Sequence, residues 1–235
     1  MISAPREPQR LAEDTLTGEM WNLSDLPWVL GAYLLGSVPF GILLAKARGV
    51  DLRAVGSGNI GATNAMRALG KPLGLFAFAL DLGKGFFVPW YLLQSGSAEA
   101  LAVASTAGVA AVAGHVCPIW IGFRGGKAVA TALGALCAVD PVVALWGGPV
   151  WIIAVFVSSH VSVGSLAMSA SFPVTAWLLR GEDEGGEWFA AAALLLCILI
   201  WARHRPNIER LLQGEEARTR LGLRSRGSAG AESDE

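Results

Sequence analysis

Three stretches of this 235-residue chain carry residue types that bind anions, and each lies next to a long apolar run. The first is 56–67 (GSGNIGATNAMR). Its glycines allow positive φ and close backbone approach, so successive N–H groups can surround an anion. Short polar side chains and a closing guanidinium also suit a phosphate. The residues expected to contribute are Gly56, Ser57, Gly58, Asn59, Gly61, Thr63, Asn64 and Arg67. Taken alone, the stretch also fits an ordinary flexible loop.

The second stretch, 114–131 (GHVCPIWIGFRGGKAVAT), places two glycines and a lysine directly before an apolar run. If that run is a helix, Gly125, Gly126 and Lys127 combine free N–H groups, the positive end of the helix dipole and a point charge. The pattern lacks the first glycine and the Ser/Thr of a nucleotide-binding P-loop. A basic pair flanking a membrane span is the alternative. His115 fits both a packed, hydrogen-bonded residue and a catalytic base.

The third stretch, 203–216 (RHRPNIERLLQGEE), gathers polar residues within about two helical turns. Positions 203, 207 and 210 follow the spacing of one helix face. The residues expected at a site are His204, Arg205, Asn207 and Glu216. A basic helix lying on lipid headgroups is the alternative interpretation.

The elements that must position these stretches are apolar. Of the chain, 53% is apolar and 16% charged, with mean hydropathy +0.50, whereas a soluble domain carries about 25% charged residues. Apolar runs cover 26–45, 72–93, 100–121, 128–139, 142–158, 163–179 and 188–202. The first three reach the roughly 20 residues that cross a bilayer as helix. Residues 128–158 as one helix would be about 46 Å long, so Asp140-Pro141 is expected to divide them. We therefore predict an all-α integral membrane protein with about seven transmembrane helices.

The charges give the predicted orientation. With the N-terminus outside and seven crossings, 14 of the 18 Lys and Arg residues fall on the inner side. The exceptions are Arg6, Arg10, Arg180 and Lys84. This asymmetry is what the positive-inside rule predicts, and it places the C-terminus and all three stretches in the cytoplasm.

The remaining features are expected to be structural. Residues 1–25 are interpreted as a disordered N-terminal extension, 26–216 as the membrane domain and 217–235 as a disordered cytoplasmic tail. Asp81 and Lys84, at i and i+3 in the second run, are expected to form a pair. Cys117, Cys137 and Cys197 lack metal or disulfide spacing and are expected to be buried in packing.

Taken together, the three stretches resemble the motifs of the bacterial acyl-phosphate:glycerol-3-phosphate acyltransferases, the PlsY family. The family's first motif, GSGNxGxTNxxR, is matched from Gly56 to Arg67, and its second, GHxxPxxxxFKGGKGVAT, from Gly114 to Thr131. Its third, HRxNIxRLxxGxE, fits from His204 to Glu216. Arg124 stands where the family has lysine, and Ala128 where it has glycine.

The resemblance implies transfer of a fatty acyl group from acyl-phosphate to glycerol 3-phosphate, the first acylation step of phospholipid synthesis. It also implies a bacterial inner-membrane location, no cofactor or metal, no nucleic acid partner, and function as a monomer in the lipid bilayer. The loop 56–64, with Ser57 and the Gly125-Gly126 turn, would hold the phosphate of the acyl-phosphate. Glycerol 3-phosphate would be bound chiefly by Arg67, Lys127, His204 and Asn207, with a lesser role for Ser162. The base could be His115, His204 or the substrate phosphate.

Two other function classes compete with this reading. A transporter for a phosphate-containing solute would also need spans and anion-binding groups, although transporters place such groups near the midplane, often between internal repeats. A non-catalytic lipid-binding scaffold is the other alternative. Release of phosphate from acyl-phosphate, dependent on glycerol 3-phosphate, is expected only of the enzyme.

Overall fold

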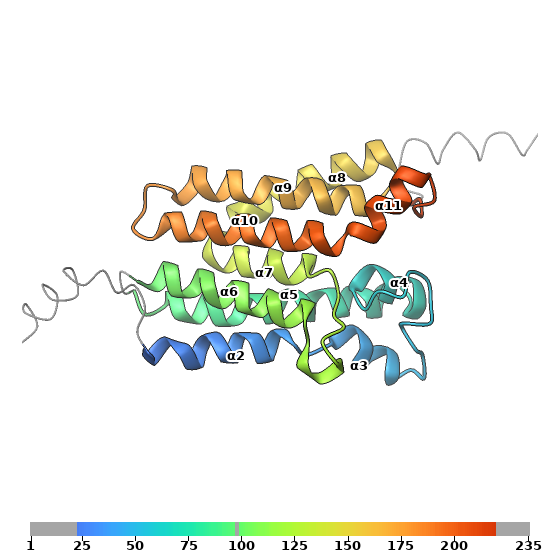
Figure 1. The fold of residues 1–235 in the computed structure, drawn as a ribbon, viewed down its shortest axis with the longest axis horizontal. Coiled ribbons are helices and arrows are strands. Elements are labelled where there is room, and N and C mark those ends of the chain that lie inside the picture. Colours follow the sequence, from blue (N-terminus) through green and yellow to red (C-terminus); the bar gives the residue numbers. More distant parts are fainter. Residues whose placement is uncertain (1–22, 97–98, 220–235) are drawn as a thin grey trace, which may run out of the picture.

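The computed structural model describes residues 23–96 and 99–219, and within these ranges every regular element is a helix. The long helices lie side by side along the longest axis (Figure 1). They are α2 (Leu26–Gly36), α5 (Lys71–Leu93), α6 (Ala100–Val116), α8 (Val142–Ser158), α9 (Val161–Arg180) and α10 (Gly186–Arg203). Helices suit a bilayer because they satisfy their own backbone groups. Many large apolar side chains point outward, among them Leu145, Trp146 and Leu178.

Five segments in the described part of the chain are long and apolar enough to cross a membrane. They are Leu23–Lys46, Lys71–Leu93, Ala100–Ile121, Val161–Arg180 and Gly186–Arg203. The predicted division of 128–158 is confirmed, because α7 (Val129–Val139) and α8 are separate apolar helices joined at Asp140-Pro141. The carboxylate of Asp140 accepts a hydrogen bond from the backbone N–H of Val142 at 2.9 Å, which holds the start of α8.

The first apolar run is not one continuous helix, as its length had predicted. Helix α2 ends at Gly36 and α3 (Phe40–Lys46) begins four residues later. Pro39 explains the break, because proline lacks a backbone N–H and disfavours helical geometry in the residue before it, here Val38.

Glycines set the spacing of the central helices. A Cβ at Gly85 of α5 would lie 2.0 Å from the carbonyl oxygen of Thr131 in α7. A Cβ at Gly134 of α7 would lie 2.0 Å from the carbonyl oxygen of Leu82 in α5. The two helices therefore approach each other at a distance that a larger side chain at either glycine would prevent.

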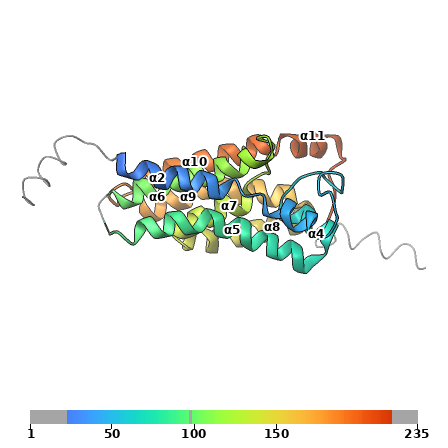
Figure 2. The same cartoon turned by 90° about the horizontal axis from the view of Figure 1, so that it is seen from below.

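One end of the molecule gathers the short elements. Helices α3, α4 (Ala62–Leu69) and α11 (Arg205–Gln213) lie at the same end, to the right in Figure 1, and the view in Figure 2 agrees. The three polar stretches thus reach one end of the helix bundle, as the topology predicted.

The two predicted disordered segments lie mostly outside the described residues. Leu23–Asp25, placed in the extension by the sequence, form a 3-10 turn that leads into α2. At the other end the described chain runs to Thr219, whose N–H donates to the carbonyl oxygen of Ser159 at 2.8 Å. Cys117 is exposed, contrary to the packing expected for it, because it follows the last turn of α6.

Candidate active site

A cavity of about 860 Å³ opens among the ends of the three polar stretches. Every stretch contributes to its wall, so the predicted convergence of these distant segments is confirmed. The predicted site residues that line it are Gly56, Ser57, Asn59, Gly61, Thr63, Asn64, Arg67, His115, Lys127, Ser162, His204, Asn207 and Glu216.

The loop of the first stretch is held by the side chain of Asn64. Its Nδ2 donates to the carbonyl oxygens of Leu52 and Val55, each at 3.0 Å, and its Oδ1 accepts from the N–H of Ser57. Gly56 has φ +58°, and a Cβ there would lie 2.4 Å from Asn64 Oδ1. The amide group of Asn64 therefore holds the loop in place, and the residue also lines the cavity. Its predicted role in binding stays a prediction.

The Gly125-Gly126 turn does not offer its N–H groups to a ligand. The N–H of Gly125 donates to the carbonyl oxygen of Val116, and that of Gly126 to His115. Their own carbonyl oxygens accept from the guanidinium of Arg203. Neither glycine lines the cavity, so the structure does not bring the N–H groups of this turn to the site. Both N–H groups are used in hydrogen bonds to the carbonyl oxygens at the end of α6.

The start of α7, which follows that turn, is the helix end that lines the cavity. Lys127, Ala128, Val129 and Ala130 all line the wall. The N–H groups in the first turn of an α-helix have no acceptor within the helix, and they carry the positive end of its dipole. Ala128 precedes α7 with φ +59°, the left-handed conformation that favours glycine.

Arg205 and Gly58 also lie away from the cavity. The Arg205 side chain is 82% exposed and pairs with Glu209 at 2.9 Å on the outer face of α11. Gly58 has φ +66° and serves the turn of the first loop. The structure does not bring Arg205 to the cavity, because the helix that carries Asn207 into the wall turns the side chain of Arg205 outward.

A polar network crosses from α7 to the C-terminal segment. Lys127 Nζ donates to Asn207 Oδ1, and Asn207 Nδ2 donates to Glu216 Oε1 at 2.6 Å. Arg210 Nε donates to Glu216 Oε2 at 2.8 Å. Burial, together with nearby arginines, lowers the pKa of Lys127 to about 8, although Glu216 opposes the shift. Burial raises the pKa of Glu216, but hydrogen bonds from Asn207, Ser162 and Arg210 outweigh it and leave that pKa below its usual value. This part of the wall therefore holds the cations Lys127 and Arg210 together with the carboxylate of Glu216.

The two histidines differ in their surroundings. His204 is buried, with Nδ1 at 2.8 Å from the carbonyl oxygen of Ile200, and burial lowers its pKa to about 4. A neutral ring that donates through Nδ1 leaves Nε2 as an acceptor. His115 lies deeper, with Nδ1 3.2 Å from Thr131 Oγ1. In the described ranges, no three His, Cys, Asp or Glu side chains gather as a metal site.

Comparison with known proteins decides the family. Residues 26–214 match the family described as "Glycerol-3-phosphate acyltransferase". The chain belongs to this family. The glycerol-3-phosphate acyltransferase of Aquifex aeolicus is 44% identical over 190 residues, covering 81% of this chain and 96% of the relative. That of Anaeromyxobacter sp. strain Fw109-5 is 43% identical over 199 residues, covering 82% and 95%.

The family likeness extends to solved structures. The crystal structure of PlsY, an integral membrane glycerol 3-phosphate acyltransferase, in its glycerol 3-phosphate form has a TM-score of 0.77 at 43% identity, covering 83% of this chain and 96% of that one. The lysophosphatidic acid form has a TM-score of 0.76 at 41% identity, covering 84% and 96%. This member of the glycerol-3-phosphate acyltransferase family is therefore an integral membrane protein.

Several wall residues of this glycerol-3-phosphate acyltransferase family member were not among the predicted site residues. Arg210 lies in the third stretch, and its i+3 spacing from Asn207 was the available signal. Asp81 was assigned only to a pair. The large apolar ones on α5, α7, α8 and α9 are Leu75, Phe78, Leu133, Trp151 and Met168. In a chain that is 53% apolar, no pattern separates such residues from ordinary packing.

Proposed function

We propose that this chain transfers a fatty acyl group from acyl-phosphate to glycerol 3-phosphate, which yields 1-acylglycerol 3-phosphate and phosphate. The observation that carries the proposal is a single cavity with two kinds of wall. Arg67, Lys127 and Arg210 bring positive charge to one part, whereas Phe78, Trp151 and Met168 give an apolar flank. A long acyl chain with a phosphate at its end, beside a second phosphate, matches that division.

The reaction needs no nucleophilic side chain from the protein. An acyl-phosphate is a mixed anhydride, so the attacking hydroxyl forms an ester bond while the carbonyl–phosphate bond breaks and phosphate leaves with the electron pair. The protein must hold two anions together and stabilise charge on the carbonyl oxygen. Ser57 with its loop and the start of α7 are assigned to the acyl-phosphate. Arg67, Lys127 and Asn207 are assigned to glycerol 3-phosphate, with Ser162 beside them.

His204 is assigned to orientation of the attacking hydroxyl. Its Nε2 can accept the hydroxyl hydrogen, but a pKa of about 4 makes the ring a weak base at neutral pH. The hydroxyl proton is therefore assigned to the leaving phosphate. Ser162 lines the same part of the wall as Glu216, and its buried hydroxyl is assigned a contact with a substrate oxygen.

The proposed placement has seven crossings, with α7 and α8 as the two short ones. The N-terminus is outside, and the cavity faces the cytoplasm of a bacterial cell whose inner membrane holds the protein. Trp28 and Tyr91, with ring centroids 4.8 Å apart, are assigned to the outer boundary because such rings favour the interface. Residues 26–216 form the catalytic unit, and a monomer is sufficient because one chain supplies the whole cavity wall.

Phosphate release from synthetic acyl-phosphate by the purified protein tests the proposal. Release should require glycerol 3-phosphate and should match the formation of acylated product. Lys127→Ala and Arg67→Ala should each lower turnover by at least about 100-fold, in line with the loss of a group that holds transition-state charge. Both should unfold at temperatures near that of the wild type.

Arg205→Ala is the matched control, because it removes a cation from the same end of the molecule but outside the cavity. Its turnover should stay within about twofold of the wild type. Near-normal turnover in Lys127→Ala would contradict the site assignment. A protein that binds both substrates without releasing phosphate would instead favour a transporter or a lipid-binding scaffold.

A further inference from the structure

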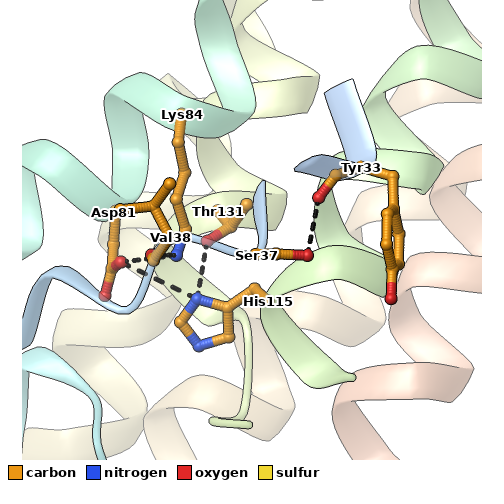
Figure 3. Close-up of polar contacts among 7 residues, drawn as sticks. All are labelled: Tyr33, Ser37, Val38, Asp81, Lys84, His115 and Thr131. Carbon is orange, nitrogen blue, oxygen red and sulfur yellow. Dashed lines mark hydrogen bonds and ion pairs between the residues drawn. The ribbon is translucent and has the colours of Figure 1, made fainter. Parts of the chain in front are cut away.

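A cluster of buried polar side chains lies within the helix bundle (Figure 3), and two of its members, Asp81 and His115, also line the cavity. Asp81 and Lys84 of α5 are 2% and 3% exposed, and Oδ1 and Nζ form an ion pair at 2.9 Å. The predicted pairing of these residues is confirmed. His115 Nδ1 lies 3.7 Å from Asp81 Oδ1 and 3.2 Å from Thr131 Oγ1. Charges are costly to keep at such depth, so a pair of this kind calls for a reason beyond packing.

One side of the cluster holds the break in the first span. Lys84 Nζ donates to the carbonyl oxygen of Val38 at 2.8 Å, between α2 and α3 (Figure 3). The ammonium satisfies a carbonyl that the break exposes, and it stands near the negative end of the α2 dipole. Beyond the break, Gly41 of α3 approaches the first loop so closely that a Cβ would lie 2.2 Å from the carbonyl oxygen of Ile60. The position of Val38 thus governs how α3 supports that loop.

The other side of the cluster supports the turn before Lys127. The N–H of Gly126 donates to the carbonyl oxygen of His115 at 3.2 Å. Gly126 also rests against the His115 ring, because a Cβ there would lie 2.3 Å from Nε2 and 3.2 Å from Cγ1 of Ile60. The imidazole, the first loop and the turn therefore meet at one point, and Lys127 is the next residue.

We infer that Asp81 and Lys84 are positioning residues for acyl transfer. Through Val38 on one side and His115 on the other, the ion pair holds the first loop and Lys127 at the separation that two phosphorylated substrates require. The inference rests on the proposed function and adds to it a part of the molecule that touches neither phosphate. It also explains why a charged pair persists inside an otherwise apolar helix.

The test removes both charges at once, so that neither is left buried without its partner. Asp81→Asn/Lys84→Met should remain folded in detergent, as judged by circular dichroism and cooperative thermal unfolding. Its kcat should fall by about 10- to 100-fold, since displacements near 1 Å have such effects. Its KM for glycerol 3-phosphate should change far less, because the individual binding groups are still present.

Asp140→Asn is the matched control. It breaks the ion pair between Asp140 and Arg180, 3.0 Å apart at the far end of the bundle, and should leave kcat within about twofold of the wild type. A folded double variant with kcat within about twofold of the wild type would overturn the inference. So would an equal loss of kcat in Asp140→Asn, because the effect would then be general destabilisation.

If the double variant fails to fold, Thr131→Val decides. It keeps the side-chain volume and removes the hydroxyl beside His115 Nδ1, so kcat should fall severalfold at nearly unchanged KM. A normal kcat in Thr131→Val would count against the inference. A wild-type protein that does not acylate glycerol 3-phosphate would instead contradict the proposed function itself.

Discussion

Lys127 shows how a single residue acquires its chemistry from its surroundings. The type and the position of this lysine were predictable, because a cation after two glycines at the start of an apolar run suits a phosphate. Its partner Asn207, 80 residues away, was predictable only as a member of another polar stretch. The sequence could not show which polar groups already form hydrogen bonds within the protein. In the structure, the N–H groups of Gly125 and Gly126 and the side chain of Asn64 do so.

The pKa of Lys127 leads to a pH dependence. Lysine is charged below its pKa, and burial brings this pKa down to about 8. We expect kcat/KM to decline as the pH rises through about 8, because the free enzyme loses its ammonium group. Glu216→Gln should shift the decline in kcat/KM to lower pH, because the carboxylate helps to keep Lys127 protonated. A limb that stays near pH 10, where an ordinary lysine titrates, would contradict the assignment.

Ala128 gives a second prediction at the residue scale. It has φ +59° and is 2% exposed at the start of α7, so its conformation is strained for any residue with a Cβ and most strained for a branched one. Ala128→Val should destabilise the protein by about 1–3 kcal/mol and lower turnover. Ala128→Gly should be tolerated, because lost burial and relieved strain oppose each other. Thermal unfolding of both variants measures this difference in stability. Equal unfolding midpoints for Ala128→Val and Ala128→Gly would contradict the prediction.

Among the elements, α5 and α7 depend on each other most closely. Glycines of both helices serve as packing positions, because small residues let membrane helices approach closely. Which glycines face a neighbour could not be inferred from the sequence, because those of a helix look alike before its partner is known. The break between α2 and α3 was not predicted, because the length of the apolar run 26–45 favoured one continuous helix in spite of Pro39.

Gly134→Ala tests that dependence. A methyl group there would lie 2.0 Å from the carbonyl oxygen of Leu82, so α5 and α7 must separate, at a cost of about 1–3 kcal/mol. We expect a lower midpoint of thermal unfolding and reduced turnover. Gly148→Ala in α8 is the control, because nothing lies within 4 Å of its Cβ and alanine favours helix. Gly134→Ala should lower the midpoint of thermal unfolding, whereas Gly148→Ala should raise it. Equal decreases in the two variants would show that α5 and α7 are not tightly packed at Gly134.

At the scale of the whole molecule, the charge asymmetry and the parity of the apolar runs predicted that three distant stretches reach one end. That part of the fold follows from the sequence because lipid restricts the chain to helices that cross it. The apolar flank of the cavity was not predictable, since Phe78, Trp151 and Met168 carry no signal in an apolar chain.

Labelling with a membrane-impermeant thiol reagent tests the proposed orientation. Arg205→Cys places a thiol on the exposed face of α11 at the cavity end, and with Cys117 replaced by alanine it should react only in inside-out vesicles. In a Cys117→Ala background, a cysteine at Gly96 should react only in right-side-out vesicles, since that turn lies at the opposite end. Reaction of both positions from one side would rule out the proposed crossings.

The two-walled cavity has a consequence for how the reaction ends. A newly formed lysophospholipid would have its headgroup among the cationic residues and its hydrocarbon tail along α5, α7 and α9, the posture of a lipid already seated in a leaflet. It can depart by sliding sideways into the surrounding bilayer, without any flip. The inorganic ion, which has no tail, would have to leave toward water instead. Under the proposed function, the two products therefore differ in where they go.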